Sequence, residues 1–194
     1  MPERTSKRLT TLAHEQVASV LIEGDVAIDA TAGNGHDTVF LRRCVGETGQ
    51  VVAFDVQALA LANTEQRLRA VFGRATDNVQ LIMSCHSTLV THCETREGDV
   101  GAVMFNLGYL PGADHRVVTT PVSTRSAIAA ACRWLRPGGL VSVLVYVGHD
   151  GGAEELGTVL ALCDQLSPRY TVDHYQSQHA PSTAPQLFRI VRDV

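Results

Sequence analysis

The chain has 194 residues, of which 45% are hydrophobic and 19% charged, and its formal net charge is −4. The hydrophobic fraction excludes a disordered chain, and the longest apolar run, residues 140–147, is far shorter than the ~20 residues of a transmembrane helix. The small acidic charge gives no general attraction to nucleic acid, so an RNA partner would need a local basic patch.

The N-terminal sequence and the cysteines indicate the compartment. The first fifteen residues are charged and polar, so we expect no secretory signal and a cytoplasmic location. The five cysteines are odd in number and contain no C-x-x-C pair, which argues against a disulfide framework and against a zinc site. We therefore expect reduced, mostly buried cysteines and no bound metal.

Short β-branched runs alternate with segments of helical periodicity along the chain. An arm with Arg4, Lys7 and Arg8 precedes a helix expected at residues 9–22. The expected strands cover residues 26–29, 50–55, 79–83, 100–106, 140–147, 170–176 and 187–191. The expected helices between them cover residues 36–44, 57–72, 86–94, 123–135 and 153–166.

This alternation predicts an α/β fold with a doubly wound, mostly parallel, seven-stranded sheet of the Rossmann-like type. The last two strands leave no room for a crossover helix, so we expect the last strand to be antiparallel. We expect residues 1–194 to form a single domain, with residues 1–24 as an N-terminal arm and helix. Ligands of such sheets bind beyond the carboxyl ends of the strands.

The turn after the first expected strand carries a G-x-G motif at Gly33 and Gly35. These glycines allow a sharp turn and a close approach of the backbone to a ligand at the start of a helix. Asp55 ends the second strand, where a carboxylate is placed to accept hydrogen bonds from a ribose diol. The pattern favours a nucleoside-containing cofactor, and the alternative is a helix-capping turn without a ligand.

The residues around the glycines discriminate between cofactors. A dinucleotide site prefers a small third residue where this chain has Thr38, and Asp37 would point a negative charge at the phosphates. The combination of Asp29, the G-x-G turn and Asp55 instead resembles the class I S-adenosylmethionine methyltransferases. In that setting Asp29 and Asp37 would lie near a positive ammonium and sulfonium, which makes their charges favourable.

The fourth expected strand ends in N-L-G-Y-L-P-G, which begins at Asn106. This turn loosely resembles the N-P-P-Y loop of amino-group methyltransferases, in which a side-chain amide oxygen accepts a hydrogen bond from the target amine. A neutral amine is already a nucleophile, so such a site needs mainly to position it. The alternative is a structural Gly/Pro turn with buried Leu and Tyr side chains.

G-N-G-H-D-T, N-L-G-Y-L-P-G and Y-V-G-H-D-G-G together resemble a small methyltransferase family labelled rRNA methylases, over roughly residues 9–166. Members methylate the aminomethyl group of the tRNA wobble uridine, giving 5-methylaminomethyl-(2-thio)uridine. The resemblance implies S-adenosyl-L-methionine as cofactor, the tRNA anticodon stem-loop as partner, and a homodimer. With the glycine loop included, the expected cofactor site comprises Asp29, Thr31, Gly33, Asn34, Gly35, Asp37, Asp55, Gln57, His86 and Asn106.

On the substrate side we expect Asn106, Tyr109 and His149 to be catalytic. Tyr109, Asp114, Tyr146 and His149 are the expected substrate-binding residues. His149, which follows the fifth strand, or Tyr146 would orient the target base or relay the amine proton, because both fall on the ligand side of the sheet. The alternatives are a plain loop histidine at position 149 and a solvated charged loop at Asp114.

Other functions remain open from the sequence. The methyl acceptor could be rRNA or a small amine in place of tRNA. The chain could also be a non-catalytic module that binds S-adenosylmethionine, or a domain that binds NAD. Titration of the two cofactors and the salt dependence of the reaction would separate these classes.

Overall fold

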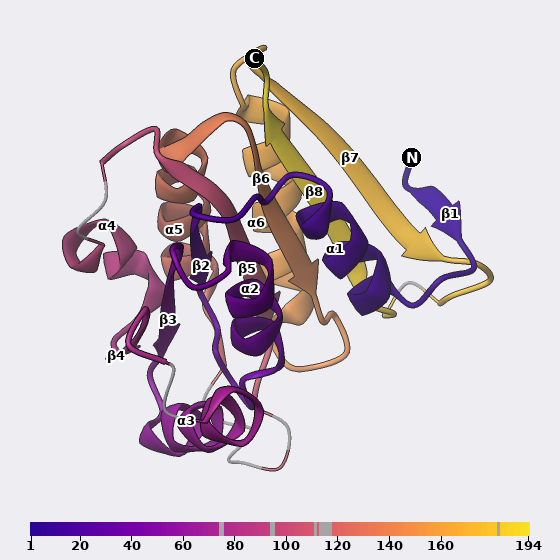
Figure 1. Ribbon diagram of the computed structural model, residues 1–194. Helices are drawn as coiled ribbons and strands as arrows, with labels where there is room; N and C mark the ends of the chain where they lie inside the picture. Colours follow the sequence, from indigo (N-terminus) through magenta and orange to yellow (C-terminus); the bar gives the residue numbers. More distant parts are fainter. Residues whose placement is uncertain (74–75, 94–95, 111, 113–117, 182) are drawn as a thin grey trace.

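The structure, a computed structural model, describes residues 1–73, 76–93, 96–110, 112, 118–181 and 183–194. One eight-stranded sheet runs through this part of the chain, in the order β1-β7-β8-β6-β5-β2-β3-β4 (Figure 1). Its strands are β1 Glu3–Thr5, β2 Val26–Asp29, β3 Gln50–Asp55, β4 Val79–Met83, β5 Val100–Leu107, β6 Leu135–Val145, β7 Tyr170–Ser177 and β8 Gln186–Arg192.

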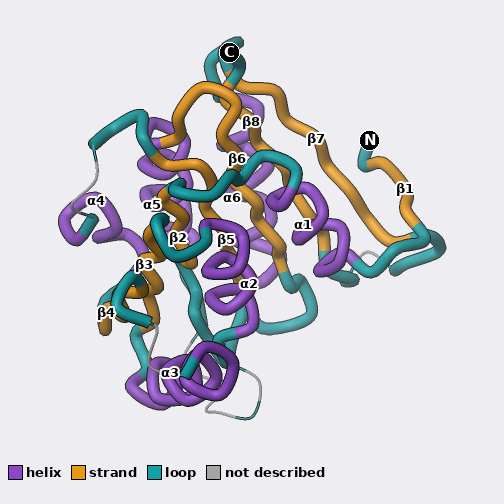
Figure 2. The backbone as a smooth tube through the Cα atoms, viewed as in Figure 1, coloured by secondary structure: helices purple, strands orange, loops and turns teal. Residues whose placement is uncertain are grey.

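The helices alternate with most of the strands along the chain and pack beside the sheet (Figure 2). They are α1 Leu9–Ala18, α2 His36–Val45, α3 Ala58–Phe72, the 3₁₀ turn η1 His86–Thr88, α4 Leu89–His92, α5 Pro121–Trp134 and α6 Gly152–Gln165. In the part of the chain that the structure describes, no helix has the length and apolar character needed to span a membrane.

Strand directions confirm the predicted fold class. Strands β2 to β6 pair in parallel, and β8 is antiparallel to both of its neighbours, β6 and β7. The predicted count of seven strands omits β1, which pairs in parallel with β7. Its three residues, Glu-Arg-Thr, are too few and too polar to show the alternation of a half-buried strand, so long-range pairing alone orders this arm.

The helix expected at residues 86–94 differs in the structure. A 3₁₀ turn and a single turn of α-helix occupy this segment, and the chain is extended at Cys93. The Thr88 hydroxyl donates to the carbonyl of Cys85 at 2.9 Å and also contacts the Ser84 hydroxyl at 2.9 Å. Such local side-chain hydrogen bonds compete with regular helix geometry, which explains the broken element.

Helices cover both faces of the sheet, α1 and α2 on one side and α5 and α6 on the other (Figure 1). The larger core lies under α5 and α6 and includes Phe105, Ile128 and Phe188, each no more than 1% exposed. The second core lies under α1 and α2 and includes Val17 and Leu41. Each such fully buried side chain contributes roughly 1.5–3 kcal/mol, so these cores hold the central strands in place.

The order of the strands creates a ligand crevice. From β2 the chain proceeds outward through β3 to β4, and it then returns to the other side of β2 to form β5 and β6. The loops that follow β2 and β5 therefore turn in opposite directions at the carboxyl ends of neighbouring strands. The candidate site lies at this point of reversal.

Candidate active site

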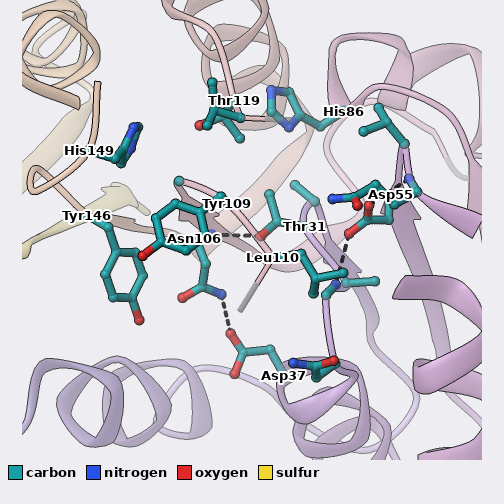
Figure 3. A pocket seen from close by; sticks show the side chains of 18 of the residues that line it. Thr31, Asp37, Asp55, His86, Asn106, Tyr109, Leu110, Thr119, Tyr146 and His149 are labelled. Atoms are coloured by element: carbon teal, nitrogen blue, oxygen red, sulfur yellow. Dashed lines mark hydrogen bonds between the residues drawn. The ribbon is translucent and has the colours of Figure 1, made fainter. Parts of the chain in front are cut away.

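A cavity of about 1080 Å³ lies at the carboxyl ends of β2, β3, β5 and β6 (Figure 3). The predicted site residues in its wall are Thr31, Gly33, Asn34, Asp37, Asp55, Gln57, His86, Asn106, Tyr109, Tyr146 and His149. Residues from five separate segments of the chain thus meet around one space. Asp114, also predicted for the substrate side, lies outside the described residues.

Asp29 and Gly35 support the wall but are not part of it. Asp29 is fully buried and accepts hydrogen bonds from the Thr31 N–H at 3.1 Å and the Thr38 hydroxyl at 2.6 Å. Burial, followed by the negative charges of Asp37 and Asp55, raises the pKa of Asp29 to about 7. The structure thus places Asp29 beneath the glycine loop, whereas the sequence predicted a direct cofactor contact.

Gly35 is required for the packing of that loop. It has a φ of 76°, and a Cβ at this position would lie 2.7 Å from the Cα of Thr64 on α3. Only glycine combines this left-handed conformation with so close an approach. The glycine loop is therefore pressed between α3 and the cavity.

Asp55 organises the β3 side of the cavity. One carboxylate oxygen accepts the N–H of Gly33 at 3.0 Å, and the other accepts the N–H of Gln57 at 2.9 Å. Each carboxylate oxygen has two acceptor sites, so both retain capacity for a ligand hydroxyl. This arrangement suits the two hydroxyls of a ribose.

Asp37 and Asn106 face one another across the glycine loop (Figure 3). The Nδ2 of Asn106 donates to Oδ2 of Asp37 at 2.6 Å, and the backbone N–H of Asn106 donates to the Thr31 hydroxyl at 2.7 Å. A carboxylate can only accept, so the amide NH₂ must face Asp37. The amide oxygen of Asn106 therefore points away from Asp37, toward the side of Tyr146 in Figure 3.

His86 contributes a buried acceptor. Its side chain packs edge-on against Phe105, and burial lowers the pKa of the imidazole to about 4, although a hydrogen bond with the backbone of Ala30 raises it. The ring is therefore neutral at pH 7. Its Nε2 is buried and has no hydrogen-bond partner among the described residues, as expected of a group that serves a ligand.

The loops after β5 and β6 form the opposite wall. The Tyr109 and His149 rings meet edge-to-face at 6.0 Å, and Nδ1 of His149 lies 2.9 Å from the carbonyl oxygen of Asp150. Because a carbonyl only accepts, Nδ1 carries the hydrogen, and Nε2 of neutral His149 is the acceptor. Burial and the charge of Asp37 raise the pKa of the Tyr146 hydroxyl.

Several residues of the cavity wall were not predicted from the sequence. Arg8 lies just before α1 and His14 lies in its middle, and Thr119, Thr183 and Pro185 come from later loops. Thr119 ends the segment that begins with N-L-G-Y-L-P-G, and Thr183 and Pro185 lie in the C-terminal loop, but the sequence indicated no role in the cavity for any of these residues. Among the described residues, no group of three or more His, Cys, Asp or Glu side chains is arranged to hold a metal ion.

The doubly wound sheet, with its cavity at the point of reversal, is the fold of the Rossmann-like methyltransferases. It matches, for example, an O-methyltransferase from Thermotoga maritima with a TM-score of 0.67 at 16% identity, covering 98% of this chain and 68% of that one. The chain belongs to the family described as "Putative rRNA methylase", whose model matches residues 51–191. The family resemblance inferred from the motifs is confirmed.

Relatives within the family are much more similar. A "putative rRNA-methylase" from Clostridium thermocellum has 36% identity and a TM-score of 0.90, and a Streptococcus mutans methyltransferase solved in complex with SAH has 37% and 0.84. Each comparison covers 97% of this chain and 99% of the other. The chloroplastic tRNA (mnm(5)s(2)U34)-methyltransferase of Arabidopsis thaliana is 42% identical over 161 residues, 80% of this chain, and this chain spans 58% of its length.

Proposed function

We propose that this protein is an S-adenosylmethionine-dependent N-methyltransferase that acts on the wobble uridine of tRNA. It converts 5-aminomethyl-(2-thio)uridine to 5-methylaminomethyl-(2-thio)uridine. The observation that carries the proposal is the orientation of Asn106, whose NH₂ is held by Asp37 so that its amide oxygen is available to a target amine. The name of the Arabidopsis relative supports the choice of acceptor.

The chemistry of the wall fits this cofactor. Among the described residues of the wall, the carboxylates of Asp37 and Asp55 are accompanied by one Arg side chain, Arg8. Such a wall favours a ligand with an ammonium and a sulfonium over one with phosphates. Asp55 would hold the ribose hydroxyls, and the buried acceptor Nε2 of His86 would meet the adenine edge. The Streptococcus mutans structure with SAH supports the same cofactor.

The remaining predicted contacts divide between the two ends of the cofactor. Asn34 and Asp37 would hold the amino-acid end, near the start of α2, while Gln57 would contact the nucleoside end beside Asp55. Asn34 is itself fixed, because its Oδ1 accepts from Nδ2 of Asn63 at 2.9 Å and its carbonyl accepts from Nε of Arg67 at 2.6 Å. The two ends are thus held by different strands of the sheet.

Catalysis would depend mainly on positioning. When bound, S-adenosylmethionine supplies an electrophilic methyl group on its sulfonium. The amide oxygen of Asn106 accepts an N–H of the target amine and so directs the nitrogen lone pair into the cavity. Fixing a reactant in this way contributes several kcal/mol to lowering the barrier. Tyr109 and Tyr146 line the cavity near Asn106 and would flank the target base.

His149 is suited to accept the proton that the amine must lose. Its Nε2 is buried, is the acceptor nitrogen of the ring, and has no hydrogen-bond partner in the described part of the chain. It lies 3.7 Å from where a Cβ on Gly108 would be, close to the Asn106 turn. The histidine would take the proton as general base, directly or through a water molecule.

The proposal extends to the partner and the compartment. Arg8 in the cavity wall, with Arg4 and Lys7 before it, provides a basic edge for the phosphates of an anticodon stem-loop, and Asp114 would belong to the same RNA-facing side. The free cysteines support the reducing cytoplasm as the location. A homodimer would enlarge the RNA-binding surface.

A synthetic anticodon stem-loop tests the acceptor directly. We would incubate the protein with methyl-labelled S-adenosylmethionine and one of two RNAs, which differ only in 5-aminomethyluridine or unmodified uridine at the wobble position. Label should enter only the aminomethyl RNA, and Asn106→Ala should reduce kcat at least ~100-fold while cofactor affinity changes less than ~3-fold. Equal labelling of both RNAs, or labelling of rRNA alone, would contradict the proposed acceptor.

A further inference from the structure

His14 contacts Asp37 of the cavity wall from a helix that precedes the first parallel strand of the site. It lies on α1, and its Nε2 is 2.6 Å from Oδ1 of Asp37. Its ring stacks on Phe40 with a centroid separation of 3.9 Å and an interplanar angle of 1°. Phe40 is one turn after Asp37 on α2, so the same helix supplies both the carboxylate and the surface that fixes the histidine ring.

The two oxygens of Asp37 have different partners. Oδ1 faces His14, and Oδ2 accepts the amide NH₂ of Asn106, also at 2.6 Å. Because a carboxylate only accepts, Nε2 of His14 must carry a hydrogen in this contact. A continuous chain of hydrogen bonds therefore runs from α1 through α2 to the end of β5.

This chain determines which atom of Asn106 meets the target. An amide can rotate by 180° and exchange its oxygen and NH₂, and only the oxygen can accept a hydrogen bond from an amine. Asp37 selects the correct orientation as long as Oδ2 points at Asn106. A carboxylate fixed on one oxygen only could swing about its side-chain bonds, whereas the contact with His14 fixes the second oxygen.

We propose that His14 is a positioning residue of the methyl transfer: through Asp37 it holds the Asn106 amide with its oxygen toward the target amine. The inference rests on the proposed function, because it assigns His14 to the same reaction. It predicts that part of the catalytic machinery comes from α1, a helix outside the strand-end loops that supply the other site residues. A misplacement of about 1 Å at such a distance from the chemistry can cost ~100-fold in rate.

A purely stabilising ion pair is the competing explanation. The two side chains are 33% and 15% exposed, and a partly exposed pair of this kind contributes little to stability. It would affect the unfolding transition and leave kcat unchanged once the protein is folded. The two explanations therefore differ in the quantity that a substitution changes.

Two substitutions separate the hydrogen bond from the ring. His14→Phe keeps the stack on Phe40 and removes the donor, whereas His14→Gln loses the ring and keeps an N–H donor near the position of Nε2. His92→Phe is the matched control, because His92 lies on α4 outside the cavity wall and its ring contact with Phe54 survives the change.

The first measurement is the kinetics of methyl transfer to the aminomethyl stem-loop. At saturating S-adenosylmethionine we expect His14→Phe to lower kcat about 10- to 100-fold, a larger change than in the dissociation constant of S-adenosylhomocysteine. His14→Gln should recover most of the rate, and His92→Phe should match the wild type. A normal kcat for His14→Phe, or equal losses in both His14 variants, would overturn the inference.

The second measurement needs no cofactor. In ¹⁵N NMR spectra, the side-chain NH₂ of Asn106 should be protected from solvent exchange in the wild type and in His14→Gln, and it should lose protection in His14→Phe. Unchanged protection in His14→Phe would refute the role of His14 even if the rate fell. A wild-type protein that methylates neither stem-loop would instead refute the proposed function, so the two failures are distinguishable.

Discussion

Asp29→Asn should abolish the loss of stability that the wild type shows as the pH rises from about 4 to about 7. The pKa of Asp29 rises from its ordinary 3.8 to about 7 in the folded protein, mainly because the carboxyl group is fully buried. The folded state therefore binds this proton more tightly than the unfolded state. The resulting stabilisation is complete below pH ~4 and is lost as the pH rises to ~7. At 1.36 kcal/mol per pKa unit the whole effect is at most ~4 kcal/mol.

Urea denaturation between pH 5 and pH 7, followed by the fluorescence of Trp134, measures this effect. Over that interval the free energy of unfolding of the wild type should fall by ~2 kcal/mol relative to Asp29→Asn, which cannot ionise at this position. Asp164→Asn, a change at an exposed carboxylate of α6, is the control and should follow the wild type. Parallel pH profiles for the wild type and Asp29→Asn would refute the raised pKa of Asp29.

Three further outcomes follow from the same geometry. Asp55→Ala should weaken the binding of S-adenosylhomocysteine about 10- to 100-fold in calorimetric titration, because it removes charged hydrogen bonds; a change below twofold would contradict its role. Glu155 on α6 is fully buried, and its carboxylate accepts hydrogen bonds from the hydroxyls of Thr119 and Thr124, each at 2.6 Å. These bonds join α6 to the loop after β5 and to α5. Glu155→Ala should lower the free energy of unfolding, measured in urea, by ~2–4 kcal/mol, whereas Glu154→Ala, at an exposed position, should lower it by less than ~0.5 kcal/mol. Similar losses in the two variants would show that the hydrogen bonds of Glu155 do not stabilise the fold. Raising salt from 50 to 200 mM should increase KM for the tRNA stem-loop steeply and leave KM for the free modified nucleoside nearly unchanged, and a flat response for the RNA would exclude phosphate contacts.

The site residues at the ends of the strands were predictable from the sequence, because each follows a local pattern. The G-x-G turn, Asp55 and Asn106 each follow a short β-branched run, and parallel strands bring their carboxyl ends to one edge of the sheet. The antiparallel end was predictable from the short connection between the last two strands. The fold class therefore also predicted that the G-x-G turn, Asp55 and Asn106 meet at one cavity.

Features that depend on long-range contacts were not predictable in this way. His14 meets Asp37 across 23 positions of sequence, and nothing in the periodicity of α1 distinguishes it from a surface histidine. The strand β1 is ordered only by its pairing with β7, more than 170 residues away. The burial of Asp29 was not predictable either, because it depends on the hydrogen bonds that its carboxylate accepts from Thr31 and Thr38.

The most direct test of the proposed function is the identity of the methylated nucleoside. The protein would be incubated with methyl-labelled S-adenosylmethionine and total tRNA from a strain that lacks the gene, and the RNA would then be digested to nucleosides and separated. The account predicts label in 5-methylaminomethyl-(2-thio)uridine and none when Asn106→Ala replaces the wild type. Label in any other nucleoside, or cofactor binding without transfer to tRNA, would contradict it.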